Sequence, residues 1–458
     1  MAARSLFQPG GAIAALLVVA ACSSSGGSDG TSSLSGSGGA QGSSSSAGSG
    51  TSGGTGGAAS SSANAGTGGD VSLTIASAGP GGSSGTGGGC MITNMDADMD
   101  GDGWTPNQGD CNDCDANVNP GAIDVPGDPK MVDNDCSGTY DPPAPCDSGL
   151  ALDDLDAKNG ARAIELCQFT TATPATPKDK TWGVLDAAYV HADGSAFPNP
   201  GAQVGIQPSF GANVHPQGGG RMLLISSGHA RTPSQADACG SKDCATTVVS
   251  NPPSGFPQDN PNCPPSKYIT DDIALEVKLR APTNATGLSF NFKFYSFEFP
   301  EWVCNKYNDQ FIALVSPSPA GSINGNISFD SLNNPVSVNL GFFDVCDPLD
   351  QVDYASNCQG ASCPHAPSPY CPKGTSELLG TGFDVWDIGY MGSISAGATT
   401  WLVSQAPVKG GEEVTIRFAM WDTGDQNYDS STLVDNFAWV ATPGVNVPVG
   451  TTPVETPK

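Results

Sequence analysis

Twelve aspartates between residues 96 and 141 have the clearest capacity for chemistry, and they share the segment with a single Lys. Asp98, Asp100 and Asp102 alternate with other residues, and a glycine follows each of the last two. Alternate carboxylates followed by glycine are typical of the opening of a calcium loop, in which oxygens surround a hard cation. Without a cation, this density of negative charge would keep the segment unfolded. The pattern therefore predicts a segment that folds around Ca²⁺.

The register of this loop is open from the sequence. A loop that begins at Asp96 fits the pattern as well as one that begins at Asp98. Neither loop has the closing Glu at its twelfth position, where Asn107 or Gly109 stands. The segment is therefore not an ordinary EF-hand. Its candidate metal ligands are Asp96, Asp98, Asp100, Asp102, Asp110, Asp113, Asp133 and Asp135.

Four blocks of the segment resemble, in order, the MopE-type metal-binding motif of bacterial surface proteins and, more loosely, thrombospondin type 3 repeats. The blocks are Asp98–Trp104, Gly109–Asp113, Val118–Ala122 and Asp133–Gly138. The resemblance implies a metal-binding module over residues 90–145. The motif has a cysteine just upstream of its last block that is absent here, whereas Cys114 is additional, so its disulfide pattern is not transferred.

Copper and a solvated acidic linker are the alternatives to calcium. Met91, Met95 and Met99 offer three thioethers, which suit Cu(I). The segment has no His, and its other candidate ligands are hard oxygens. Copper is therefore the less favoured metal.

The N-terminal residues predict export and a lipid anchor. An apolar run from Gly11 to Ala21 follows Arg4, and its length fits a signal peptide over residues 1–21 rather than a spanning helix. The run ends in Leu-Val-Val-Ala-Ala-Cys, which resembles a bacterial lipobox and implies that Cys22 is lipidated. Ser23 follows the cysteine, which by the same resemblance favours the outer membrane. We expect acyl chains on Cys22 to hold the chain at the cell surface.

Two segments are predicted to be disordered. Of the 67 residues from Ser23 to Gly89, 50 are Gly, Ser or Thr, so residues 22–89 cannot bury enough apolar surface to offset the entropy of ordering. Residues 441–458 contain four Pro and are expected to form a disordered tail.

The cysteines predict disulfides. Without Cys22 the chain has 14, an even number, and an exported chain meets an oxidising compartment. Cys146 with Cys167 is a plausible closure, as are pairings among Cys358, Cys363 and Cys371. A four-thiolate zinc site is the alternative for the cysteines of the acidic segment, which are Cys90, Cys111, Cys114 and Cys136.

Residues 146–440 predict a β-sandwich of jelly-roll type. Apolar side chains alternate with polar ones over residues 273–279, 288–294 and 414–420, as in antiparallel strands with one buried face. Further strands are expected at 311–315, 326–329, 336–340, 400–404 and 433–440, and Leu155–Cys167 is expected to form a short helix.

Two stretches of this region resemble the choice-of-anchor L domain of bacterial surface proteins. The first comprises Ser296–Val303, Tyr307–Phe311, Asn326–Phe329 and Pro335–Asn339. The second runs from Trp421–Asp425 through Asp429 to Asp435–Phe437. The resemblance covers roughly residues 180–440 and implies an extracellular sandwich with no known reaction. Phe297 departs from the family, in which a second acidic residue is common there, and residues 346–371 form a cysteine-rich insertion.

Acidic residues at the strand ends of the sandwich predict a second calcium site. Glu298, Asp309 and Asp435 are its candidate ligands, and Asp422, Asp425 and Asp429 lie nearby in sequence. A carboxylate inside a sandwich needs a partner, and the chain has only 18 Lys and Arg against 46 Asp and Glu. Solvated surface loops are the alternative.

The sequence as a whole favours a binding or adhesion module. Its net charge of −28 argues against a nucleic-acid partner. It has no nucleophile elbow, zinc-protease motif or phosphate-binding loop, so we expect no enzyme. A surface glycan or protein is the expected partner. The alternative is a carbohydrate-binding or carbohydrate-active sandwich, with Trp302, Tyr307, Trp386, Trp401 and Trp421 as candidates for stacking on sugar rings.

Overall fold

A computed structural model of the protein describes residues 91–244, 249–259, 263–265, 268–339, 342–349, 371–385 and 392–458. The predicted signal peptide, Cys22 and the Gly/Ser-rich tether lie outside the described residues, as do Cys90, Cys358, Cys363 and Trp386. No helix in the described part of the chain is long and apolar enough to cross a membrane.

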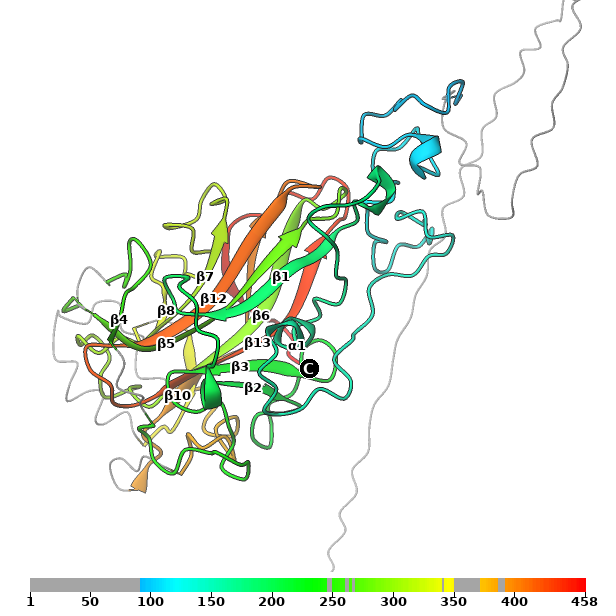
Figure 1. Cartoon of the computed structure of the whole chain (residues 1–458). Coiled ribbons are helices and arrows are strands. Elements are labelled where there is room, and N and C mark those ends of the chain that lie inside the picture. The colour runs from blue at the N-terminus through cyan, green and yellow to red at the C-terminus, as the bar shows by residue number, and fades with distance from the viewer. Residues whose placement is uncertain are drawn as a thin grey trace, which may run out of the picture. The chain divides into compact units, whose positions relative to one another are not determined.

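Two antiparallel sheets form a β-sandwich (Figure 1), which confirms the predicted fold class. The first sheet has the order β1 (Gly183–Val190), β5 (Ile269–Arg280), β12 (Glu413–Thr423), β7 (Gln310–Ser316) and β8 (Val336–Ser337), with β4 (Val249–Ser250) beside β5. The second has the order β14 (Gly450–Pro453), β11 (Leu402–Pro407), β6 (Gly287–Ser296), β13 (Ser430–Val440), β3 (Met222–Ser226) and β2 (Val204–Gln207). In this second sheet β10 (Gly397–Thr399) pairs with β6 and with β9 (Phe343–Cys346).

The chain crosses between the sheets in the manner of a jelly roll. It passes from β3 to β5, back to β6 and again to β7, and later from β11 to β12 to β13. As a result β12 lies between β5 and β7, and β13 lies between β3 and β6. These interleaved pairings are those of an eight-stranded jelly roll.

The main core lies between the sheets and follows the predicted period of two. The alternating apolar residues of β5, β6 and β12 are all buried in one cluster, and Phe290 packs edge to face on Phe418 across the sandwich. Burial of each such side chain contributes about 1.5–3 kcal/mol to the free energy of unfolding.

The outer faces of both sheets are also covered, which the alternating pattern did not predict. Tyr295, Phe297 and Leu433 form a second apolar cluster with Phe210 and Phe383, which come from connecting segments. On the other sheet a third cluster contains Trp421 and Phe256. Polar residues of the strands are therefore buried beneath loops as well as exposed.

Several predicted elements differ in extent. Helix α1 covers only Ala157–Arg162, and Asp156 caps its first turn by accepting a hydrogen bond from the Lys158 amide. Residues 326–329 make isolated bridges instead of a strand, and the predicted strand at 336–340 is reduced to β8. Short 3₁₀ turns occur at Pro106–Gln108, Pro177–Asp179 and Gly201–Gln203.

The predicted disordered tail was wrong, because β14 pairs with β11 along four residues. Thr451 is buried, and its hydroxyl lies 2.7 Å from that of Ser404. An edge strand tolerates Pro453 because only one side of it needs ladder hydrogen bonds.

The acidic segment docks on the sandwich through the turn between β5 and β6. Asn284 donates to the carbonyl of Ile123 (2.8 Å) and accepts from its amide (3.0 Å). The Thr283 hydroxyl donates to Asn119 (2.7 Å). Gly121 is required beneath Trp104, since a Cβ there would lie 2.6 Å from the indole ring.

Candidate metal centre

Five of the predicted ligands converge in the acidic segment, and we call them the aspartate cluster. Ligand oxygens of Asp98, Asp100 and Asp113 lie within 4.8 Å of one another. The same holds for Asp100, Asp102 and Asp110, so Asp100 belongs to both groups. A hard cation with six to eight oxygen ligands suits such a set.

Backbone amides hold the carboxylates of the aspartate cluster. Asp98 accepts hydrogen bonds from the amides of Gly101 (2.6 Å) and Gly103 (3.0 Å). Both glycines have positive φ, +82° and +97°, which favours glycine in this tight turn. This arrangement places the start of the loop at Asp98, whereas Asp96 accepts from the Asn107 side chain outside both groups.

Each of three aspartates in the cluster has one oxygen held and one oxygen unused. One carboxylate oxygen of Asp102 accepts from the Trp104 amide and one of Asp110 from the Asn112 amide, both at 2.8 Å. The second oxygens of Asp100, Asp102 and Asp110 are buried and have no hydrogen-bond partner. Oxygens in this state are suited to accept a cation.

Burial and mutual repulsion act on these acids together. Burial, with smaller contributions from neighbouring aspartates, raises the pKa of Asp102 to about 6 and that of Asp110 to about 6. The amides that donate to them oppose the rise. A bound cation would reverse this balance by stabilising the charged forms.

A second group of three acids lies in the same segment, and sequence reasoning identified only one member. Asp124, Asp135 and Asp141 bring ligand oxygens within 4.8 Å of one another. Asp124 is 1% exposed and accepts from the amides of Asn134 (2.5 Å) and Asp141 (2.6 Å). Asp133 instead caps a turn by accepting from the amides of Ser137 and Gly138.

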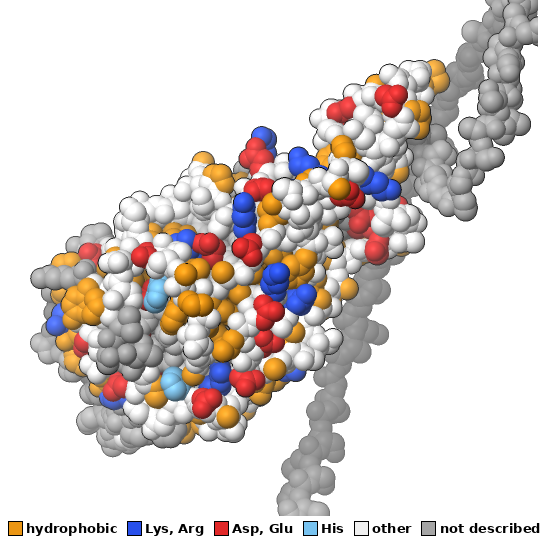
Figure 2. All heavy atoms as spheres, viewed as in Figure 1, with side chains coloured by type: hydrophobic (Ala, Val, Ile, Leu, Met, Phe, Trp, Pro, Cys, Tyr) orange, Lys and Arg blue, Asp and Glu red, His pale blue; other side chains and the backbone are white. Residues whose placement is uncertain are grey.

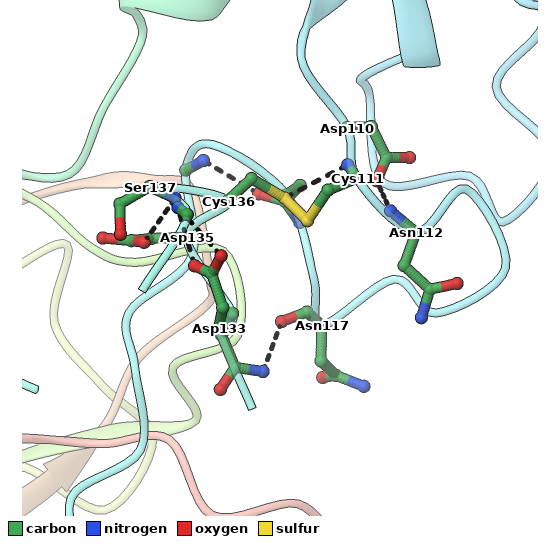
Figure 3. The surroundings of a disulfide bond; sticks show 12 residues. Asp110, Cys111, Asn112, Asn117, Asp133, Asp135, Cys136 and Ser137 are labelled. Carbon is green, nitrogen blue, oxygen red and sulfur yellow. Dashed lines mark hydrogen bonds between the residues drawn. A yellow bond between two sulfur atoms is a disulfide. The ribbon is translucent and has the colours of Figure 1, made fainter. Parts of the chain in front are cut away.

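A disulfide connects the two acidic groups. Cys111 and Cys136 are bonded, and Figure 3 shows Asp110 on one side of the bond and Asp133 and Asp135 on the other. The four-thiolate zinc alternative is therefore wrong, because two of its sulfurs are consumed in this bond. The three thioether residues of the copper alternative, Met91, Met95 and Met99, are 74%, 52% and 47% exposed.

The predicted disulfide Cys146–Cys167 is confirmed. Cys371 pairs with Cys346 rather than with Cys358 or Cys363. Two further disulfides are Cys239–Cys244 and Cys263–Cys304.

In the sandwich, Glu298 and Asp309 lie together at one end. The amide of Asp309 donates to Glu298 Oε2 (3.4 Å). The negative charges of Asp309 and Asp429 contribute to a raised pKa of Asp422, and the charge of Asp309 contributes to a raised pKa of Asp429. We call Glu298, Asp309, Asp422 and Asp429 the polar-end cluster. It lies where β6, β7, β12 and β13 begin or end.

Asp435 does not share a site with Asp309, contrary to the sequence prediction. The Ser430 hydroxyl donates to Asp309 (2.6 Å), and Asp435 lies five residues farther along β13. At about 3.3 Å per residue these positions are roughly 16 Å apart. Sequence proximity could not reveal this because β13 runs from one end of the sandwich toward the other.

Asp435 instead joins Glu165 and Asp147. Its carboxylate accepts from the amides of Gln217 (2.5 Å) and Gly218 (3.2 Å), whereas Glu165 interacts with the Asp435 carboxyl and the Asn436 amide. Burial and the charge of Asp435 raise the pKa of Glu165 to about 9, and burial raises that of Asp435 to about 7. Glu165 has a positive φ of 67°, which its residue type does not predict, and it lies in no recognisable motif. Its place beside Asp435 therefore could not be predicted from the sequence.

The candidate stacking aromatics divide into two groups. Trp401 and Trp421 are 3% and 0% exposed and belong to the core, so they cannot stack on a sugar. Trp302 and Tyr307 line a small cavity with Tyr428, beside Glu298 and Asp425.

Comparison with known proteins supports the sandwich resemblance. Residues 266–437 match the family model of the choice-of-anchor L domain, which indicates a surface-associated protein. The matched range contains the whole polar-end cluster. No curated protein and no solved structure matches the chain.

Proposed function

We propose that this protein is a surface lipoprotein whose extracellular sandwich serves as a calcium-dependent binding or adhesion module. The carrying observation is the aspartate cluster, in which two groups of three carboxylates share Asp100 and leave buried oxygens unused. Calcium is the favoured ion because every described ligand there is an oxygen. The proposal that lipidated Cys22 anchors the chain in the outer membrane rests on the lipobox resemblance.

Calcium would act on binding by ordering the segment that docks on the sandwich. The segment has almost no regular secondary structure and depends on carboxylate–amide contacts. Loss of the ion would leave these carboxylates to repel one another. The sandwich face in Figure 2 carries Lys and Arg interspersed with Asp and Glu, so it offers no patch of a single charge for a partner.

Adhesion of intact cells tests this function. Cells that display the wild-type chain are expected to adhere to a glycan or protein surface in calcium and to detach in EDTA. Asp100→Ala should abolish adhesion in calcium. The matched control is Asp96→Ala, because Asp96 lies outside both groups of the cluster. Equal adhesion of all three chains with and without EDTA would contradict the proposal.

A carbohydrate-binding sandwich is the second candidate. A cavity of ≈ 370 Å³ is lined by Trp182, Phe437 and Trp439 together with Glu165, and its size is within the range of small-molecule sites. A glycan array with the wild type and Trp439→Ala tests it, and sugar retention lost in the variant is the expected result.

A further inference from the structure

The polar-end cluster gathers four carboxylates from both sheets. Glu298 follows β6, Asp309 precedes β7, Asp422 lies near the end of β12 and Asp429 precedes β13. Their residues are 2%, 0%, 1% and 4% exposed, respectively. The jelly-roll crossing brings these four chain positions to one end of the sandwich.

The hydrogen bonds of the cluster satisfy only part of it. Asp309 accepts from the Thr423 amide (3.0 Å) and the Ser430 hydroxyl, and Asp429 accepts from the Cys244 amide (2.8 Å). No donor with ordinary hydrogen-bond geometry reaches either oxygen of Asp422 or the second oxygen of Asp429, although the Ser227 hydroxyl and the Asp309 carboxyl interact with Asp422. An unpartnered carboxylate this deeply buried is costly unless a cation or a proton neutralises it.

The charges that act most strongly on the cluster are all negative. Asp309, Asp429 and Glu298 act on Asp422, while Asp243, Asp271 and Asp309 act on Asp429. Burial and this repulsion hold the pKa of Asp422 and that of Glu298 well above their usual ranges. The cluster lacks a compensating positive charge among its strongest neighbours.

We propose that Glu298, Asp309, Asp422 and Asp429 bind one divalent cation of the calcium type, separate from any ion in the aspartate cluster. The ligands are all carboxylate oxygens, which suits a hard cation. The nearby sulfurs of Cys239 and Cys244 are consumed in a disulfide and cannot bind a metal. Within the described residues no three of these four side chains bring ligand oxygens within 4.8 Å of one another, so binding of one ion requires the carboxylates to move closer together.

A small cavity reaches one member of the cluster, Glu298. A cavity of ≈ 60 Å³ is lined by Glu298, Trp302, Tyr307, Asp425 and Tyr428. A cavity of this size accommodates water, which could complete the coordination shell. The disulfide Cys239–Cys244 holds one ligand in place, because the Cys244 amide donates to Asp429.

The ion would join the two sheets. Asp309 and Asp422 belong to the sheet of β7 and β12, whereas Glu298 and Asp429 flank β6 and β13 of the other sheet. Binding to the native chain alone stabilises it by RT ln(1 + [L]/Kd). Calcium should therefore raise the unfolding temperature through this cluster as well as through the aspartate cluster.

The test uses the full chain with Asp100→Ala and Asp124→Asn, which remove the ligand shared within the aspartate cluster and the most buried member of the group of Asp124, Asp135 and Asp141. After removal of metal, terbium is added and its luminescence, sensitised by tryptophan, is followed while calcium competes. One calcium-displaceable ion per chain is expected. Asp422→Asn and, separately, Glu298→Gln in this background should weaken terbium binding at least tenfold, whereas Asp330→Asn should not, because Asp330 is a buried carboxylate with local hydrogen bonds.

Metal analysis of the folded chain with Asp100→Ala and Asp124→Asn provides a measurement that needs no substitution in the polar-end cluster. About one calcium should remain bound after gel filtration in dilute calcium. No retained calcium, or terbium affinity unchanged by both Asp422→Asn and Glu298→Gln, would overturn the proposal and leave protons as the neutralising partners. If only the aspartate cluster fails to bind calcium, the wild type and the Asp100→Ala chain should retain the same amount of calcium.

Discussion

The carboxylate of Asp309 accepts a hydrogen bond from the hydroxyl of Ser430 (2.6 Å), and this contact joins the start of β7 in one sheet to the start of β13 in the other. Both residues are fully buried. The bond shows that the acidic end of the sandwich is part of the contact between the sheets. Changes in its charge should therefore affect the stability of the whole domain.

Asp309→Asn and Asp435→Asn should respond differently to calcium. Asp309 lies in the polar-end cluster, so its variant should lose stability mainly when calcium is present, since it loses the stabilisation by bound ion. Asp435 accepts three backbone hydrogen bonds, so its variant should lose about 1–3 kcal/mol with or without calcium. Thermal unfolding in calcium and in EDTA measures both. The same calcium dependence in the two variants would contradict the separation of the sites.

Glu377→Gln should destabilise the chain more than Lys293→Met. The Lys293 ammonium is fully buried and pairs with Glu377 at 2.6 Å, and burial lowers its pKa. Removing the carboxylate leaves a buried charge without its partner, which costs about 3–5 kcal/mol, whereas removing the ammonium leaves a carboxylate that water can reach. Urea unfolding of both variants at pH 7 decides the order. A larger loss for Lys293→Met would show that the pair is not the main interaction of Lys293.

Metal-free stability should fall as pH rises from about 4 to 9. Burial raises the pKa of Glu165 to about 9 and that of Asp435 to about 7, whereas both groups titrate near ~4 in an unfolded chain. In that window the native state binds more protons than the unfolded state, so the free energy of unfolding decreases by up to about 1.4 kcal/mol per pH unit for each proton. Glu165→Gln should flatten the decrease.

Urea unfolding in EDTA at pH 5, 7 and 9 measures this slope. Glu412→Gln is the control, because Glu412 is exposed and pairs with Lys409 on the surface. An identical slope in the wild type and in Glu165→Gln would exclude Glu165 as the source of the pH dependence.

Cys22→Ser should move the protein from the membrane fraction to the soluble fraction. The variant lacks the thiol that carries the acyl chains, and the Gly/Ser-rich tether offers no other affinity for lipid. Fractionation followed by immunoblotting of cells is the measurement. Membrane retention equal to that of the wild type would refute the lipid anchor.

Alternation of apolar and polar residues predicted the central strands because each has one face on the main core. It missed β2 and β3, whose residues are all buried: β3 is a short apolar run without alternation, and β2 has only four residues, of which two are Gly205 and Gln207. The connecting segments that cover the outer faces explain this loss of signal. Phe383, for example, packs on Tyr295 and Phe297 from a segment without regular structure.

Spacing along the chain predicted the aspartate cluster because its ligands are close in sequence. It failed for Asp435, because cross-strand distance depends on topology rather than on sequence separation. It also gave no signal for Asp124 as a member of the second group, since Asp124 stands ten residues from Asn134 and meets it only through the fold. Glu165 was missed for the same reason.

Calcium titration calorimetry on the full metal-free chain tests the central claim most directly. The wild type is expected to bind calcium with submillimolar affinity, and Asp100→Ala should lose the sites of the aspartate cluster, while Asp96→Ala should bind as the wild type does. Magnesium should bind much more weakly, because it demands stricter octahedral geometry and retains its water. No heat of calcium binding to the wild type up to millimolar concentration, or equal binding by Asp100→Ala, would contradict a segment that folds around calcium.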